Sequence, residues 1–249
     1  MTESFDDYSN YYDLLYKDKN YQEESKYIDD LIKNFSKTNN ETLLELGCGT
    51  GAHAQYLSKY GYNIYGIDKS KIMIELADTN KNFQCSQGDI CSFSLDTKFD
   101  NAVSLFHVIS YINNNNDLKK AFKNVSNHLK SGGLFIFDVW YTPAVYSIKP
   151  SKQNKVFEDH EMKIERNASP DIDYLNNIVK VNYEISVHKK STNENFSINE
   201  SHSMRHFSYN EIILLSENYN FELVLAEEMI SKNNICNDTW GACFVLRKR

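Results

Sequence analysis

The sequence predicts an α/β fold in which helices cover both faces of a mostly parallel sheet. Five short apolar runs alternate with helix-like segments over the first 140 residues, and a glycine-rich turn, GCGTG, follows the first run directly. Strands that alternate with helices form parallel sheets covered on both faces. Such sheets bind ligands at the carboxyl ends of their strands. The five runs occupy 42–46, 62–68, 83–89, 99–106 and 134–140.

The segments between these runs carry apolar residues at helical spacing. Residues 116–130 place Phe122 and Val125 on one face of a predicted helix. Ser70 is suited to cap a helix over 70–78, because its hydroxyl can accept a hydrogen bond from the first turn. Further helices are predicted within a tyrosine-rich entry over 8–36, and over 52–60 and 208–218.

The pattern changes after Pro150. Three stretches alternate apolar and polar residues with a period of two, which is typical of antiparallel strands: KVFEDHEMKIER, NNIVKVNYEISVHKK and NFSINESHSMRHF. We therefore expect three inserted strands within 151–206, as a cap on the substrate side or as the association surface of a homodimer. Two last strands, 221–229 and 241–249, return to the main sheet. This gives a seven-stranded sheet within a single domain over 1–249.

Composition narrows the class of function. The chain has 249 residues and a net charge of -7, with no block of lysine or arginine, which argues against nucleic acid as the main partner. Its apolar runs are too short to span a bilayer. The five cysteines form no CxxC pair, which predicts free thiols in the cytoplasm. We expect a cytoplasmic protein with a small-molecule substrate, no membrane partner and no metal.

The glycine loop allows two classes of ligand, because glycines let backbone N–H groups approach any ligand closely. A dinucleotide would favour GxGxxG with an acid about 20 residues later. Asp68 stands 21 residues after Gly47, which fits that spacing. The third glycine, however, is Gly51, so that the pattern is GxGxG. The pattern therefore argues against a dinucleotide.

The acids around the loop favour S-adenosylmethionine (SAM). Glu45, just before the loop, suits a cationic amino-acid end and would be unfavourable beside a diphosphate. Asp68 suits a ribose diol, and Asp89, after the third run, suits an adenine amino group. The ends of the fourth and fifth runs should bring Phe106, His107 and Asp138–Trp140 to the same edge of the sheet.

The motifs LLELGCGTG, GIDKS, QGDI and LKSGGLFIFDVW resemble those of the class I SAM-dependent methyltransferases, in order and in spacing, over residues 8–147. The resemblance implies a Rossmann-like sheet and SAM as cofactor. It implies that Asp68 binds the ribose hydroxyls. The remaining residues of the expected cofactor site are Gly47, Cys48 and Gly49 at the methionine end, Asp89 and Ile90 at the adenine, and Glu45, Lys69 and Phe106.

A narrower resemblance concerns YYDLLYKDKNY, SLFHVISYI and FDVWYTPAVY, which are similar to the dTDP-amino-sugar N,N-dimethyltransferases of the desosamine and mycaminose type. It implies that Tyr16 meets the substrate and that Tyr21 contacts SAM. Trp140 and Tyr141 would border the sugar nucleotide. The chain departs from that group at His107, where the group has a small polar residue, and in the inserted strands.

Several residues keep two interpretations. His107 is either a structural histidine or a proton acceptor, and Tyr16 is the other candidate for that catalytic role. His202 and Arg205 either bind a substrate diphosphate or lie on a solvated strand face. The sequence thus predicts methyl transfer from SAM to a small polar acceptor, foremost the amino group of a nucleotide-linked sugar. The alternatives are another small metabolite with an N, O or C acceptor, or a non-catalytic SAM sensor or partner subunit.

Overall fold

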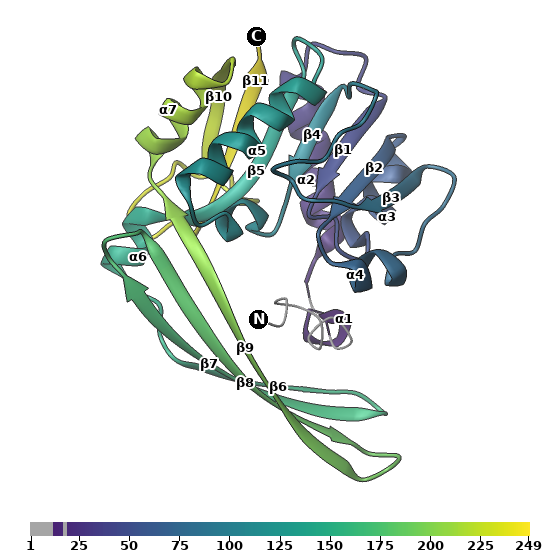
Figure 1. Ribbon diagram of the computed structural model, residues 1–249, viewed down its shortest axis with the longest axis vertical. Coiled ribbons are helices and arrows are strands. Elements are labelled where there is room, and N and C mark those ends of the chain that lie inside the picture. Colours follow the sequence, from purple (N-terminus) through teal and green to yellow (C-terminus); the bar gives the residue numbers. More distant parts are fainter. Residues whose placement is uncertain (1–11, 17–18) are drawn as a thin grey trace.

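The computed structural model describes residues 12–16 and 19–249, so that Tyr8 and Tyr11 of the predicted entry lie outside the described residues. Its main sheet has seven strands in the order β3-β2-β1-β4-β5-β11-β10, and it confirms the predicted α/β fold (Figure 1). The first five strands in this order are parallel, and β11 runs antiparallel to both of its neighbours. The strands are β1 (Thr42–Leu46), β2 (Asn63–Asp68), β3 (Phe83–Gln87), β4 (Asn101–Ser104), β5 (Leu134–Tyr141), β10 (Phe221–Glu228) and β11 (Gly241–Lys248).

Helices cover both faces of this sheet, with a separate apolar core under each layer. Helices α5 (Asn115–His128) and α7 (Tyr209–Asn218) bury Phe122 and Ile212 against one face. Helices α2 (Tyr21–Phe35) and α3 (Ala52–Leu57) bury Ile28 and Leu57 against the other. The remaining short helices are α1 (Tyr12–Leu15), η2 (Ser58–Tyr60), α4 (Lys71–Leu76), η3 (Val108–Tyr111) and α6 (Thr142–Ser147).

The inserted segment contains four strands, so the prediction of three was wrong. They are β6 (Gln153–Glu158), β7 (Met162–Asp173), β8 (Ile178–Lys189) and β9 (Glu194–Phe207), each antiparallel to the next, and the end of β9 pairs in parallel with β5. KVFEDHEMKIER is a hairpin, because Asp159 accepts hydrogen bonds from the backbone of Glu161 and Met162 and so turns the chain. The role of this segment as a cap or an association surface stays a prediction.

Strand ends at the ligand edge differ from the expected ones. The fourth strand ends at Ser104, not at residue 106, because Phe106 and His107 have positive φ angles of 66° and 61° and leave the extended conformation. Two adjacent non-glycine residues in the left-handed region are strained, a condition that gathers at functional sites. Within the described part of the chain, no helix is both long and apolar enough to cross a membrane.

A buried carboxylate ties together the starts of β1 and β4. Asp100 is 1% exposed, and its side chain accepts hydrogen bonds from the backbone N–H groups of Glu41 and Thr42 and from the Thr42 hydroxyl. Lys130 Nζ lies 2.9 Å from its other oxygen. Burial alone would raise the pKa of Asp100, but the hydrogen bonds from Lys130 and Thr42 outweigh it, and the pKa lies below its ordinary value.

Replacing this carboxylate should destabilise the fold in a pH-dependent way. Asp100→Asn should lower the free energy of unfolding by about 2–3 kcal/mol at neutral pH, because an amide offers one acceptor oxygen to four donors. A carboxylate with a lowered pKa stabilises the fold above its unfolded pKa, and this contribution is lost as the pH falls through the folded pKa. The difference from wild type should therefore shrink by about pH 3, as measured by urea unfolding at both pH values.

Asp96→Asn is the matched control, since Asp96 is exposed in the loop before β4. It should change the free energy of unfolding by less than about 0.5 kcal/mol at either pH. An equal loss in Asp100→Asn at neutral and acid pH would show that the charge of Asp100 does not matter.

Candidate functional site

A cavity of about 720 Å³ lies at the carboxyl ends of the main-sheet strands, between that edge and the inserted sheet. The inserted strands curve away below the main sheet, and α1 lies in the angle between the two (Figure 1). The main-sheet side of the lining contains Tyr21, Gly47, Cys48, Gly49, Asp68, Lys69, Asp89, Ile90, Phe106, His107 and Trp140, and the other side contains Tyr16, Tyr183, His202 and Met204. The cavity thus brings together most of the predicted site residues.

The glycine loop presents bare backbone to this cavity. Gly47 and Gly49 have positive φ angles, 71° and 54°. A Cβ at Gly47 would lie 2.5 Å from a methyl group of Val108, whereas a Cβ at Gly49 would meet no atom within 4 Å. Asp68 holds the loop in place, because its carboxylate accepts hydrogen bonds from the backbone of Gly49 at 2.8 Å and of Ser70 at 2.8 Å. Space for a ligand therefore begins at Gly49.

Asp89 lies further along the same edge. Its side chain is 41% exposed, accepts a hydrogen bond from the backbone of Cys91 and lies 3.4 Å from Lys69 Nζ. Burial works to raise the pKa of Asp89, but the hydrogen bonds from Cys91 and the charge of Lys69 lower it overall. An ionised acceptor thus lines the same cavity as Gly49, beside Ile90, which also lines it.

Glu45, unlike the other residues predicted to bind the cofactor, does not line the cavity. It is 2% exposed and absent from the cavity lining, and its Oε2 has no hydrogen-bond partner within the described part of the chain. Its Oε1 lies 3.8 Å from Nδ1 of His53, which does line the cavity and lies 2.7 Å from Glu24. Burial and the nearby charge of Asp68 raise the pKa of Glu45 to about 8. Glu45 therefore stands behind His53, in surroundings that favour its protonated form.

His107 lies beside a buried carboxylate at the end of β5. Its Nδ1 is 2.6 Å from Oδ2 of Asp138, without the alignment of a hydrogen bond, and its backbone N–H donates to the same carboxylate. Asp138 is 2% exposed. Burial works to raise its pKa, but the charge and hydrogen bonds of His107 lower it overall. Asp138 is thus an ionised group that orients His107 from behind.

Aromatic side chains form the wall around His107. The Trp140 ring meets the His107 ring edge-on at 6.3 Å, and the Tyr16 ring meets Phe106 edge-on at 5.0 Å. The guanidinium of Arg166 lies 5.7 Å from the Tyr16 ring. This end of the cavity combines flat apolar faces with hydroxyl and imidazole groups, a combination suited to a ring with polar edges.

Two predicted substrate contacts lie outside the cavity. Tyr141 is 8% exposed and packs in the main core, because it follows Trp140 on β5 and successive strand residues point to opposite faces. Arg205 lies on β9, where Met204 lines the cavity, and its guanidinium binds Glu211 at 2.6 Å. Strand alternation thus separates both residues from the cavity side.

Sequence reasoning missed several residues of the lining, among them Tyr111, His53 and Tyr183. Tyr111 ends η3, His53 lies in the first turn of α3, and Tyr183 lies on β8. His53 directly follows the glycine loop and could have been chosen from that position. Tyr183 carried no usable signal, because the period-two pattern does not say which face of an inserted sheet turns toward the cavity.

Comparisons with known proteins agree with this geometry. Residues 44–137 match the family model described as a methyltransferase domain. The chain is 30% identical over 145 residues to the dTDP-3-amino-3,4,6-trideoxy-alpha-D-glucopyranose N,N-dimethyltransferase of Streptomyces venezuelae, covering 57% of this chain and 60% of that one. It is 30% identical over 104 residues to the dTDP-4-amino-2,3,4,6-tetradeoxy-D-glucose N,N-dimethyltransferase of Saccharopolyspora spinosa, covering 41% and 42%. These alignments span less than two thirds of each relative.

Solved structures match the chain over nearly its whole length. Streptomyces venezuelae DesVI superposes with a TM-score of 0.82 at 21% identity, covering 97% of this chain and 98% of that one. A SAM-dependent methyltransferase from Clostridium acetobutylicum superposes with a TM-score of 0.79 at 22% identity, covering 98% of both. The chain therefore resembles the class I SAM-dependent methyltransferases in sequence, the dTDP-amino-sugar N,N-dimethyltransferases among them, and it has their fold.

Proposed function

We propose that this protein binds SAM along the main-sheet edge of the cavity and transfers its methyl group to the amino group of a nucleotide-linked sugar. The observation that carries the proposal is the division of one cavity into two ends. A bare glycine loop and two acids line one end, and aromatic rings with His107 and Tyr16 line the other. The names of the relatives support a sugar amine as the acceptor, since those proteins are N,N-dimethyltransferases of dTDP-linked amino sugars.

The residues present fit the cofactor. The open space in front of Gly49 receives a ligand that passes close to the loop. In this proposal the backbone from Gly47 to Gly49 and the ring of Tyr21 hold the methionine end, with Glu45 acting through His53. Asp68 binds the ribose hydroxyls. The remaining assigned contacts are Lys69, Asp89 and Ile90 at the adenine and Cys48 and Phe106 along the cavity wall.

The protein has a small chemical task in such a reaction. Bound SAM supplies an activated methyl group on a sulfonium. The chain has to place an amine in line with it, exclude competing water and keep the amine lone pair available. Trp140 and Tyr16 are placed to hold the sugar ring. His107, with Asp138 behind it, is placed to accept a hydrogen bond from the amine and so direct the lone pair.

Incubating the purified protein with SAM and a panel of sugar nucleotides tests this function. Amino sugars and their hydroxyl counterparts are offered in parallel, and products are followed by mass spectrometry. We expect release of S-adenosylhomocysteine and a gain of one or two methyl groups on an amino sugar alone. Methylation of a hydroxyl sugar would replace the proposed acceptor. SAM binding without turnover of any acceptor would favour a sensor or partner subunit.

The open space at Gly49 predicts a specific loss of cofactor binding. Gly49→Ala places a methyl group where SAM should pass, so that SAM affinity should fall by ~10-fold or more, a cost of at least ~1.4 kcal/mol. Isothermal titration calorimetry measures it. Gly61→Ala is the matched control, because Gly61 also has a positive φ, 100°, and open space around a Cβ. Alanine is more strained at Gly61 than at Gly49, where φ is 54°, so backbone strain would not explain a loss confined to Gly49→Ala, and equal affinities in the two would contradict the placement of SAM.

Disrupting the pair of His107 and Asp138 should slow methyl transfer without weakening SAM binding. His107→Ala should lower kcat by ~10–100-fold, and Asp138→Asn should have an effect of similar size because it releases the His107 ring. SAM affinity should stay within about twofold in His107→Ala. His160→Ala is the control, since His160 is exposed at the turn between β6 and β7. Unchanged kcat in His107→Ala would remove His107 from the acceptor site.

A further inference from the structure

A buried carboxyl group stands behind the glycine loop without a counter-charge of its own. Glu45 lies on β1, two residues before Gly47, and is 2% exposed. Its Oε2 has no hydrogen-bond partner among the described residues. Its Oε1 lies 3.8 Å from Nδ1 of His53, which is too long for a hydrogen bond. A carboxyl group in such surroundings is more stable as the neutral acid than as the anion.

His53 stands between Glu45 and the cavity, which it lines. Its Nε2 lies 2.7 Å from Oε2 of Glu24, and Lys19 forms an ion pair with the other oxygen of Glu24. Because an ionised carboxylate can only accept, Nε2 of His53 carries the hydrogen of this contact. Burial lowers the pKa of His53, so the ring is neutral at neutral pH. Lys19 therefore balances the charge of Glu24 and leaves Glu45 unbalanced.

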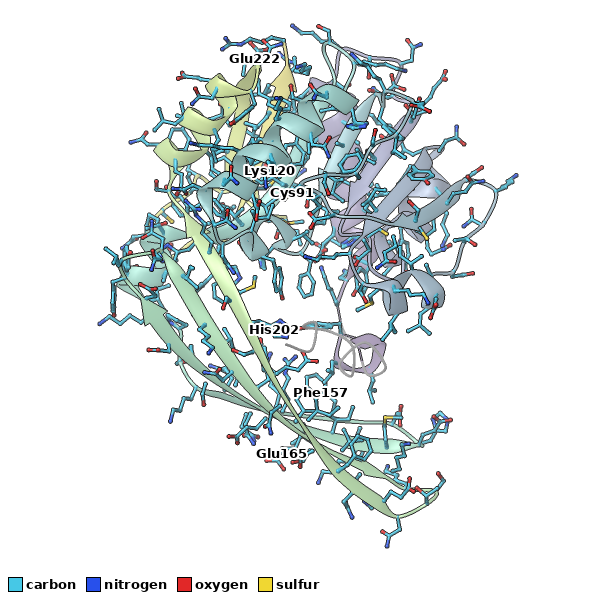
Figure 2. The ribbon with its side chains drawn as sticks, in the orientation of Figure 1. Cys91, Lys120, Phe157, Glu165, His202 and Glu222 are labelled. Carbon is cyan, nitrogen blue, oxygen red and sulfur yellow. The ribbon has the colours of Figure 1, made fainter. Side chains whose placement is uncertain are left out.

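The groups around Glu45 add no positive charge. The titratable groups that face Glu45 are Cys48 in the glycine loop, His53 on α3, Asp68 on β2 and Cys85 on β3. Those that face His53 from its other sides are Lys19, Tyr21 and Glu24 on α2, and Asp138 on β5. All of them lie on the main-sheet side, whereas His202 faces the cavity from the inserted sheet (Figure 2). Lys19 is the one lysine in this described set.

We propose that binding of SAM is coupled to the release of a proton from Glu45, an inference that rests on the proposed function. The methionine end of SAM carries an ammonium group, and the glycine loop and His53 would bring it to the side of Glu45. The ammonium supplies the missing counter-charge, which favours the ionised acid. The O–H bond of Glu45 then breaks, its proton passes through the cavity to water and buffer, and the carboxylate remains opposite the ammonium. A neutral nucleoside would gain nothing from Glu45.

Hydrogen bonding assigns the proton to Glu45 in preference to Asp68. Burial raises the pKa of both groups, and for Glu45, where the charge of Asp68 adds to burial, the value reaches about 8. The two oxygens of Asp68, however, accept hydrogen bonds from the backbone N–H groups of Gly49 and Ser70, which favour its carboxylate. Asp89 has a lowered pKa and is already ionised. Glu45 is thus the acid on this side that is best suited to hold a proton before the cofactor arrives.

Calorimetry in buffers of different ionisation enthalpy counts the released protons. Wild type at about pH 7 should release ~0.5–1 proton per SAM bound, and Glu45→Gln should release none. SAM affinity of wild type should rise by up to ~10-fold per pH unit between about pH 6 and pH 7.5, because more Glu45 is already ionised, and that of Glu45→Gln should stay constant. Asp89→Asn is the matched control, an acid of the same cavity whose loss should weaken SAM binding and leave the proton count unchanged. No release in wild type, or equal release in Glu45→Gln, would overturn the linkage.

Two further ligands locate the group that triggers the release. S-Adenosylhomocysteine keeps the ammonium without the sulfonium and should release as many protons as SAM. 5′-Methylthioadenosine lacks the amino-acid end and should release none. Release by methylthioadenosine, or by SAM alone, would overturn the assignment to the ammonium.

Infrared difference spectroscopy observes the acid itself. SAM should remove the absorption of a protonated carboxyl group in wild type and should leave the spectrum of Glu45→Gln unchanged in that region. Retention of this absorption in SAM-bound wild type would overturn the linkage. SAM that binds without proton release refutes the linkage alone, whereas SAM that does not bind refutes the proposed function and the linkage with it. Proton release without turnover of any acceptor would refute the proposed acceptor and support the linkage.

Discussion

The end of strand β5 is the constraint on which the rest of the site depends. This strand pairs with β4 on one side and with β11 on the other, and its last two residues, Trp140 and Tyr141, also pair with His206 and Phe207 of β9. The two backbone pairings with β9 join the inserted sheet to the main sheet. Strands can shift their hydrogen-bond register only by whole residues. The two pairings therefore hold the inserted sheet at a set position relative to the main sheet. Tyr141 belongs to this junction, which explains why it is buried while Trp140 faces the cavity.

Local signals made the main sheet and the glycine loop predictable. An apolar run that ends at GCGTG is typical of a buried strand followed by a tight turn. In a parallel sheet, the residues that follow the strands lie at one edge. Asp68, Asp89, Phe106 and His107 therefore reached one cavity from positions 39 residues apart in the sequence. The inserted strands carried no comparable signal. Their alternation indicates two faces but not which face turns inward, and this ambiguity explains why Arg205, which lies outside the cavity lining, was among the predicted contacts while Tyr183 was omitted.

Charge at the cavity is arranged by the partners of each carboxylate, since Asp138 and Glu45 are both 2% exposed. Asp138 stays ionised because His107 adjoins it, and Asp89 stays ionised because Lys69 and the backbone of Cys91 stabilise its charge. Glu45, with no hydrogen bond to Oε2 within the described residues and a pKa raised to about 8, sits at the opposite extreme. A cation bound near His53 would favour its ionised form. The sequence showed an acid before the loop, but it did not show that this acid is buried without a hydrogen bond to Oε2 from the described residues.

A hydrogen bond between the main sheet and the inserted sheet also crosses the junction at β5. Tyr111 belongs to the main-sheet side, at the end of η3, and His202 belongs to β9. The 2.9 Å contact between them therefore depends on the pairing of Trp140 with His206, four residues along β9 from His202. A shift of one residue in the pairing between β5 and β9 would turn each side chain of β9 to the other face of its sheet. His202 would then no longer reach the Tyr111 hydroxyl. This hydrogen bond thus depends on how the two sheets are joined, whereas the geometry of the glycine loop depends on the main sheet alone.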